Sequence, residues 1–597
     1  MSVRRSMCGI AGIMMRDGQV ADSGTLKKMA AALVHRGPDG AGIFCHGTVG
    51  LLNTRLAIVD IDHGQQPFIA DDGTVLVANG EIYNDPDIRE SLPQAGFKSG
   101  SDCESALHLY EKYGLGFTRH LRGMYALALF DARKQALVLA RDPYGIKQLY
   151  YVMTPAFFAF ASEPQALIAA GLAGRSLVPR VRAEMLQLQF TTGTTTVFAD
   201  IQRLLPGETL VIDNAAIVHQ ERRRPHTRRA TRPVPLSYET AYRQLDQHLQ
   251  DSVRLHMRSD APVGLFLSGG IDSSALLTVM SRLDSRPVVA LTATFPGAGS
   301  KNERSVAEAL ARGAGADHHC VDMAAADFFN HAPHLASALD DPTADSSALP
   351  LFLLARAARK DGLKVVLSGD GADELFGGYR RYRRAAWFFG LWRQKTRTRG
   401  VFSSLMPADS LPAWRTGLAQ SEKAESVPAI SAMQTLQAID CAEWLPNNLL
   451  LKLDRCLMAH GIEGRTPFLD PVLSPFAYDL PETLKVRNGL GKWLLRDWVA
   501  RNAPGSDPWS KKQGFIPPVG QWIDQYKSRI EPLLLNHPAI AELSLQAAVR
   551  RIYAAPLRHP QAAWSLLFYT LWHNRHVLGV TARGSIDEVL DAARLAA

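Results

Sequence analysis

The first 215 residues carry short apolar runs broken by turns, which is the pattern of antiparallel strands. Residues 74–84 form one such run, and residues 124–142 contain two, separated by the polar stretch Asp-Ala-Arg-Lys-Gln. Residues 149–163 repeat this arrangement. Helical periodicity at residues 22–37 predicts a helix capped by Asp22 or Ser23 and stopped by Gly37. We therefore expect antiparallel sheets with a few helices in this half.

Beyond residue 236 the pattern changes to strands that alternate with helices. Residues 237–257 have helical periodicity. The apolar runs that follow are residues 261–270, 286–295, 317–323 and 363–371. Such alternation predicts a parallel sheet covered by helices on both faces, with ligands bound beyond the carboxyl ends of its strands. The end of the chain, including residues 562–579, is apolar and is predicted to be helical.

The length of 597 residues is too great for one hydrophobic core and indicates two domains. We place an N-terminal domain at residues 8–215 and a C-terminal domain at residues 236–597, joined by an Arg/Pro-rich linker at residues 216–235. The chain carries 66 Lys and Arg against 58 Asp and Glu, a net charge of +8. Residues 221–232 hold six Arg and one Glu, so +5 of this excess is local to the linker, and no nucleic-acid partner is expected.

The apolar runs and the cysteine spacing indicate the compartment of the protein. No run approaches 18 uninterrupted apolar residues, and no apolar core of signal-peptide length follows the first six residues. We therefore expect a cytoplasmic protein with no membrane partner. The six cysteines form no CxxC pair, which fits neither a disulfide framework nor a zinc site.

The sequence LFLSGGIDSS at residues 265–274 is a strand that enters a glycine-rich turn and then a helix. Its backbone can close around phosphate oxygens, and Ser268, Ser273 and Ser274 add hydroxyl donors. Asp272 would repel phosphate unless a cation stands between them, so we expect it to bind Mg²⁺. The pattern lacks the GxxxxGK[ST] lysine. The alternative is a glycine-rich turn that serves packing alone.

A second strand ends in the sequence SGDGADELFGGY, which places Asp370, Asp373 and Glu374 within five residues. Three such carboxylates repel one another unless a metal, a cationic substrate or a raised pKa separates their roles. The alternative is a solvated acidic loop. Because this loop also follows an apolar strand, we expect it at the same sheet edge as the first loop.

These two motifs, with residues 340–350, 449–470 and 512–515, resemble the synthetase domain of glutamine-dependent asparagine synthetases. The resemblance implies a PP-loop ATP-pyrophosphatase fold in which the carboxylate of aspartate attacks ATP, and ammonia then displaces AMP from the acyl adenylate. It also implies that Asp272 and Asp373 hold Mg²⁺ and that Lys512 neutralises charge on the phosphates. The implied contacts to ATP and pyrophosphate are Leu267, Ser268, Gly269, Gly270, Asp272, Ser273, Ser274, Thr294, Ser368 and Gly369.

Position 370 departs from the family pattern. Asparagine-forming members commonly carry Glu here, as the group that removes a proton from the attacking ammonia, whereas this chain has Asp370. The shorter side chain reaches one methylene less, and a misplacement near 1 Å can cost about 100-fold in rate. The acceptor is therefore either aspartate or another carboxylate, on a sugar, a peptide or a secondary metabolite.

The first half resembles the class II glutamine amidotransferase domain, an N-terminal-nucleophile αββα sandwich. The matching motifs are CGIAGI from Cys8, HRGPDG from His35, NTRLAIVD from Asn53, NGEIYN from Asn79 and SDCE from Ser101. The resemblance implies that Cys8 is the nucleophile and that Asn79 and Gly80 form the oxyanion hole. The implied glutamine contacts are Arg55, Ile58, Val59, Asn79, Glu81 and Asp102. It also favours a homodimer.

The role of Cys8 requires a free amine at that residue. A terminal α-amine has a pKa near 7.7–8.0, so roughly a quarter is neutral at pH 7.4 and can take the thiol proton. We therefore expect Met7 to be the initiator, or residues 1–7 to be removed. Cys45 and Cys103 cannot gain such an amine without internal cleavage. The remaining alternatives are a β-lactam-synthetase-like ligase with a vestigial glutaminase, a non-catalytic protein on this scaffold and a tRNA-modifying PP-loop enzyme.

Overall fold

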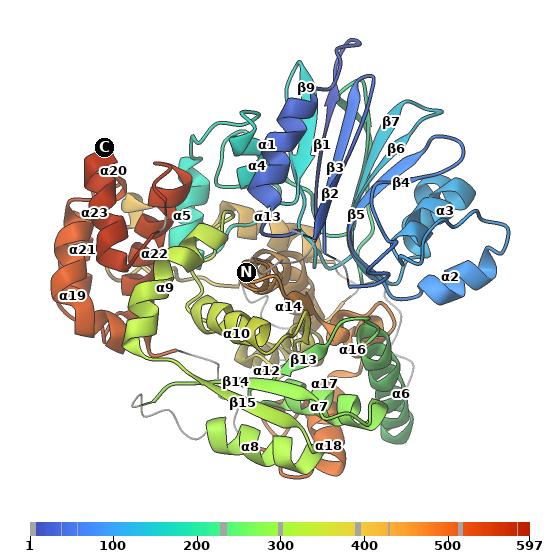
Figure 1. Ribbon diagram of the computed structural model, residues 1–597. Helices are drawn as coiled ribbons and strands as arrows, with labels where there is room; N and C mark the ends of the chain where they lie inside the picture. Colours follow the sequence, from blue (N-terminus) through green and yellow to red (C-terminus); the bar gives the residue numbers. More distant parts are fainter. Residues whose placement is uncertain are drawn as a thin grey trace.

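The chain folds into two domains that pack against each other along a broad interface (Figure 1). Two antiparallel sheets form the N-terminal domain, and a parallel sheet with flanking helices forms the C-terminal domain. The computed structural model describes residues 8–37, 39–56, 58–226, 236–296, 303–387, 396–427, 430–510, 517–581 and 583–596.

Two six-stranded sheets build the N-terminal domain. The first has the order β10-β8-β9-β1-β3-β2 and the second the order β12-β11-β7-β6-β5-β4. The strands of the first sheet are β1(Gly9–Met15), β2(Gly40–His46), β3(Val49–Arg55), β8(Tyr150–Met153), β9(Phe157–Ala161) and β10(Gln202–Arg203). Those of the second are β4(Phe68–Ile69), β5(Val75–Ile82), β6(Gly123–Asp131), β7(Ala136–Arg141), β11(Glu208–Asp213) and β12(Ala216–Arg222).

Strand β1 is buried on both faces, which explains why its sequence is apolar without alternation. Ile10 and Met14 pack into the core between the two sheets. Ala11 and Ile13 point the opposite way and pack with Leu26 of a covering helix. The helices on the outer faces are α1(Ser23–Leu33) and α4(Pro164–Ala169) over the first sheet and α3(Glu104–Tyr113) over the second. The αββα sandwich expected from the sequence is confirmed.

Local signals placed most of these elements correctly. Asp22 caps α1 by accepting the backbone N–H groups of Gly24 at 2.9 Å and Thr25 at 2.8 Å, although the helix ends at Leu33, before Gly37. The two expected hairpins are β6–β7 and β8–β9. Residues 216–222, which the sequence places in the linker, form β12 at the edge of the second sheet, while residues 227–235 lie outside the described residues.

Five parallel strands form the sheet of the C-terminal domain, as the alternating pattern predicts. They are β15(Asp317–Asp322), β14(Val289–Thr294), β13(Val263–Phe266), β16(Val365–Leu367) and β17(Glu463–Arg465), in that spatial order. The helices around them include α6(Tyr238–His256), α7(Ile271–Leu283), α8(Glu303–Ala314) and α10(Ala348–Lys360). Leu265 of β13 lies opposite Leu367 of β16, so both glycine-rich loops leave the same edge of the sheet.

The end of the chain forms a helical layer on one side of both domains (Figure 1). Its main helices are α19(Val519–Leu535), α21(Gln546–Tyr553), α22(Pro560–His576) and α23(Ile586–Ala596). Helix α22 is buried along nearly its whole length and packs on α9(Ala325–Ala338) and on α5(Pro179–Leu188) of the N-terminal domain. None of the described helices is long and apolar enough to cross a membrane.

Ion pairs at the interface hold the two domains in one relative orientation. The Arg36 guanidinium lies 2.8 Å from both Asp454 and Glu163, and it is fully enclosed. Arg122 of the N-terminal domain lies 2.8 Å from Asp470 of the other domain. Leaving one member of such a pair alone in the interior is strongly unfavourable, so these contacts resist any sliding of the interface.

Candidate active sites

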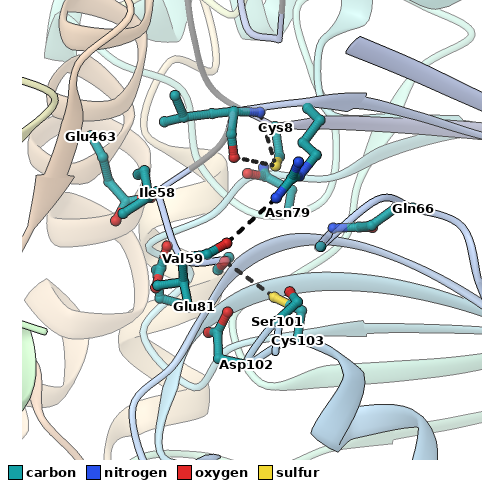
Figure 2. A pocket seen from close by; sticks show the side chains of 14 residues that line it. Cys8, Ile58, Val59, Gln66, Asn79, Glu81, Ser101, Asp102, Cys103 and Glu463 are labelled. Atoms are coloured by element: carbon teal, nitrogen blue, oxygen red, sulfur yellow. Dashed lines mark hydrogen bonds between the residues drawn. The ribbon is translucent and has the colours of Figure 1, made fainter. Parts of the chain in front are cut away.

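A cavity, with about 390 Å³ of space that is partly open to solvent, lies between the ends of β1, β3 and β5, close to the domain boundary (Figure 2). It gathers residues from five segments of the N-terminal domain and one from the C-terminal domain. The lining residues are Cys8, Arg55, Leu56, Ile58, Val59, Gly64, Gln66, Asn79, Gly80, Glu81, Ser101, Asp102, Cys103 and Glu463. The structure therefore brings together every residue of the first half that the sequence assigns to catalysis or to glutamine.

The Cys8 thiol lies at the inner end of β1, against the backbone that follows β3. The Leu56 N–H donates to its Sγ at 3.4 Å, and the thiol lies 3.8 Å from the Leu56 carbonyl oxygen. Burial raises the pKa of Cys8 to about 11, which keeps the thiol neutral at physiological pH. No histidine or lysine is among the described residues that line the cavity, so these side chains provide no neutral amine or imidazole as base.

Asn79 and Gly80 lie side by side on β5 and offer hydrogen-bond donors to the cavity. The Nδ2 of Asn79 is buried and has no hydrogen-bond partner. An unpaired buried donor is costly, and a ligand oxygen would satisfy it. Packing also favours glycine at position 80, because a Cβ there would lie 2.1 Å from the Met124 carbonyl oxygen.

Charged side chains on the opposite wall suit the two ends of an amino acid. The Arg55 guanidinium is held by the carbonyl oxygens of Ile61 at 2.9 Å and of Asp60 at 2.5 Å. Asp102 accepts the backbone N–H of Ile82, and burial raises its pKa to about 6. Burial and the neighbouring Asp102 also raise the pKa of Glu81 well above its usual range. A bound ammonium group would favour the ionised form of both carboxyls.

A second and larger hollow, with about 1920 Å³ of space open to solvent, lies at the carboxyl edge of the parallel sheet. The predicted site residues in its wall are Leu267, Ser268, Gly269, Gly270, Asp272, Ser273, Ser368, Gly369, Asp370 and Asp373. Both glycine-rich loops thus face one space. Gly269 has φ +69°, and Gly371 in the second loop has φ +91°, conformations that side chains larger than hydrogen resist.

Two of the described predicted residues are not in this wall, and a third lies outside the described residues. Ser274 lies one turn into α7, and its hydroxyl donates to the Gly270 carbonyl oxygen at 2.8 Å. Thr294 lies at the end of β14, where its hydroxyl donates to Asp322. Neither lines the hollow in the described residues. Lys512 lies outside the described residues, so its role remains a prediction from the sequence.

Lys492 occupies the centre of the site and was missed by the sequence analysis. Its Nζ lies 2.6 Å from Asp272 and 2.7 Å from Asp373, so the two carboxylates converge on one cation. Burial alone would lower the pKa of Lys492, but the two carboxylates outweigh it and raise it. No motif in the sequence marks Lys492, which lies between the two-residue strand β19(Leu490–Gly491) and α18(Trp493–Asn502).

The same convergence tests the expected Mg²⁺ site. Mg²⁺ is bound by one or two carboxylates together with substrate phosphates, and Asp272 and Asp373 supply such a pair at the mouth of the first loop. No group of three or more metal-binding side chains was found in the part of the chain that the structure describes. The residues present fit a magnesium ion that shares its coordination with phosphate oxygens.

Asp370 lies half-buried beside this pair. Its carboxylate accepts the Ser368 hydroxyl at 2.7 Å, while burial raises its pKa above its usual range. Lys452 lies near enough to oppose that rise and is itself held by Asp345 at 2.6 Å. The Asp370 carboxylate can therefore act as a proton acceptor.

Comparison with known proteins matches both halves to established families. Residues 7–223 match the glutamine amidotransferase domain, and residues 244–574 match asparagine synthase. Asparagine synthetase [glutamine-hydrolyzing] 1 of Bacillus subtilis (strain 168) is 30% identical, with 96% of this chain and 97% of the relative covered. A putative asparagine synthetase [glutamine-hydrolyzing] of Mycobacterium tuberculosis (strain ATCC 25618 / H37Rv) is 32% identical, with 95% and 97% covered. Amidase chyE of Penicillium rubens (strain ATCC 28089 / DSM 1075 / NRRL 1951 / Wisconsin 54-1255) is 31% identical over 63% of this chain and 60% of its own.

Proposed function

The chain belongs to the asparagine synthase family, and we propose that it forms asparagine from aspartate, with ammonia released from glutamine at Cys8. It is an ATP-dependent amidotransferase ligase that uses glutamine as nitrogen donor. The observation that supports the residue assignments is that the glutamine-site candidates all line one cavity, while most of the described ATP-site candidates line a second one on the same chain.

At the first cavity, the reaction splits the side-chain amide of glutamine. The Cys8 sulfur attacks the amide carbon while the α-amine of Cys8 takes the thiol proton. Asn79 Nδ2 and the Gly80 N–H stabilise the oxyanion, and ammonia leaves with the proton that the amine returns. Water then hydrolyses the thioester to glutamate. Arg55 binds the substrate carboxylate, and Asp102 with Glu81 binds its ammonium group.

The second cavity activates the acceptor. An oxygen of the acceptor carboxylate attacks the α-phosphorus of ATP, which forms an acyl adenylate and releases pyrophosphate. Asp272 and Asp373 would hold Mg²⁺, which would neutralise charge on the phosphates. Lys492 and Lys512 provide positive charge for the pyrophosphate. Ammonia then attacks the acyl carbon, Asp370 takes a proton from it, and AMP leaves.

The acceptor is tested by pyrophosphate release across a panel of carboxylates. We expect aspartate to support release at least about tenfold faster than succinate or a sugar acid, because the lost contacts of a poor acceptor cost about 1.4 kcal/mol or more. The assay uses native enzyme, ATP, Mg²⁺ and ammonium chloride. Indifference of the rate to aspartate would overturn the choice of acceptor and leave the ligase chemistry intact.

A second candidate acts by the same chemistry on a different carboxylate. Asp370 in place of the family's usual Glu favours it, and so does the width of the second hollow, which has an apolar wall at Leu351, Leu354 and Leu449. Such a wall could seat a larger or more apolar acceptor than aspartate. Faster pyrophosphate release with a peptide or sugar carboxylate than with aspartate would support this candidate.

The proposed base predicts unequal effects on the two half-reactions. Asp370→Asn should slow amide formation by about 10²-fold to 10⁴-fold, because the proton of the attacking ammonia loses its acceptor. Pyrophosphate release in the first turnover should fall much less. Asp370→Glu should lose no more than about 100-fold, since it keeps a carboxylate displaced by one methylene. Rapid-quench measurement of acyl adenylate and amide checks both variants, and equal loss of the two steps in Asp370→Asn would exclude a base role.

A further inference from the structure

The wall of the first cavity is not made by the N-terminal domain alone. Glu463 lines it from β17 of the C-terminal domain (Figure 2). Two residues further along β17, Arg465 contacts Glu81 of the cavity wall at 3.2 Å. We propose that Arg465 is a positioning residue for glutamine hydrolysis, which orients Glu81 across the domain boundary. This inference rests on the proposed role of the cavity in binding glutamine.

The guanidinium of Arg465 is fixed by all its other donors. Its Nε donates to Glu463 at 2.6 Å, and its Nη1 donates to the carbonyl oxygens of His256 at 2.8 Å and Arg258 at 2.6 Å. The group is planar and fully enclosed, so these bonds set the direction of Nη2. Nη2 makes no hydrogen bond of its own and faces Glu81.

The positive charge of Arg465 offsets the crowding of carboxyl groups in this cavity. Glu81, Asp102 and Glu463 crowd carboxyl groups into an enclosed space, and burial with Asp102 raises the pKa of Glu81 well above its usual range. Arg465 opposes that rise. Recognition of an ammonium group needs the ionised carboxylate, so the arginine keeps Glu81 in its binding form over a wider pH range.

The backbone of Arg465 belongs to the second site at the same time. Its carbonyl oxygen accepts the N–H of Ser368 at 2.9 Å, and the Ser368 hydroxyl donates to Asp370 at 2.7 Å. One residue therefore touches the glutamine-binding wall with its side chain and the acceptor-site loop with its main chain.

The test compares Arg465→Met with Arg122→Met in the full-length protein. Arg122 is a matched control, because it also forms a charged contact between the domains, with Asp470 at 2.8 Å, but lines neither cavity. Arg465→Met should raise the KM for glutamine by about tenfold or more, with a smaller change in kcat. The acid limb of kcat/KM should move to higher pH by about one unit, because Glu81 then ionises later. Arg122→Met should leave both values near those of the native enzyme.

Arg465→Lys covers the case in which Arg465→Met does not fold, since it keeps the buried charge. It should hold the acid limb near its native pH while KM for glutamine rises about threefold, because an ammonium group lacks the planar guanidinium whose other bonds aim Nη2 at Glu81. Cooperative thermal unfolding at a Tm near that of the native enzyme shows that both variants are folded.

A double-mutant cycle with Glu81→Gln shows whether Arg465 acts through Glu81. The double variant should raise the KM for glutamine by less than the product of the two separate fold-changes of Arg465→Met and Glu81→Gln. Effects that multiply independently, or equal damage from Arg122→Met, would overturn the positioning role. Native enzyme that does not hydrolyse glutamine, or Cys8→Ala that still does, would instead refute the proposed function of the cavity.

Discussion

Replacing Cys8 by alanine should reduce glutamine-driven amide formation by about 10³-fold or more, while ammonia-driven formation stays within about twofold of the native rate. The thiol is the only group in the first cavity that we assign to attack on the amide, and it makes no contribution at the second cavity. Product formation with glutamine and with ammonium chloride as alternative nitrogen donors measures both effects in one preparation.

Cys103→Ala is the matched control for this prediction. Cys103 lines the same cavity, and its thiol donates to the Gly80 carbonyl oxygen at 3.2 Å, but burial raises its pKa well above the usual range and its nitrogen is an amide inside the chain. The variant should keep most of the glutamine-driven activity. Equal loss of glutamine-driven and ammonia-driven synthesis in Cys8→Ala would contradict the division of labour between the cavities.

Attack by the Cys8 thiol also requires a free α-amine at Cys8. Because burial raises the pKa of Cys8 to about 11, the thiol needs a nearby base, and we assign that role to its own α-amine. Intact mass measurement of glutamine-active protein should therefore find Cys8 as the first residue. Full glutaminase activity from a chain that retains residues 1–7 would refute the assignment.

Asp272→Asn and Asp373→Asn should impair the second cavity, whereas Cys8→Ala should impair the first. Each should reduce both glutamine-driven and ammonia-driven synthesis by about 10²-fold or more, while glutamine hydrolysis at the first cavity continues. The two carboxylates converge on Lys492 and form the one paired anionic site that we assign to Mg²⁺. Their loss removes the charge that holds the metal beside the phosphates.

Asp284→Asn provides the matched control, because this residue ends α7, the helix whose first turn carries Asp272, and it pairs locally with Arg286 at 2.8 Å. It should leave synthesis near the native rate. Glutaminase and pyrophosphate assays on the same samples separate a lost site from a lost fold. Synthesis that survives in Asp373→Asn would remove that residue from the metal site.

The predicted elements that the structure confirms are those set by local pattern. Hairpin signals placed β6–β7, the Asp22 cap placed the start of α1, and strand–turn–helix signals placed both glycine-rich loops. Each depends on residues within a few positions of one another, where propensity and turn chemistry dominate. The end of α1 was predicted four residues too late because the apolar pattern continues through Val34, beyond the last helical turn.

The sequence by itself determined the two chemistries, because each motif that carries them is a short continuous run that can be recognised on its own: the run from Cys8, the Asn79–Glu81 run, the loop with Asp272 and the Asp370–Asp373 loop. The tertiary structure alone decided which charges complete those sites. Lys492 lies 220 positions after Asp272, and Arg465 meets Glu81 across a domain boundary. Such contacts leave no periodicity or spacing in the chain, since they arise only when packed elements bring distant residues into one low-dielectric space.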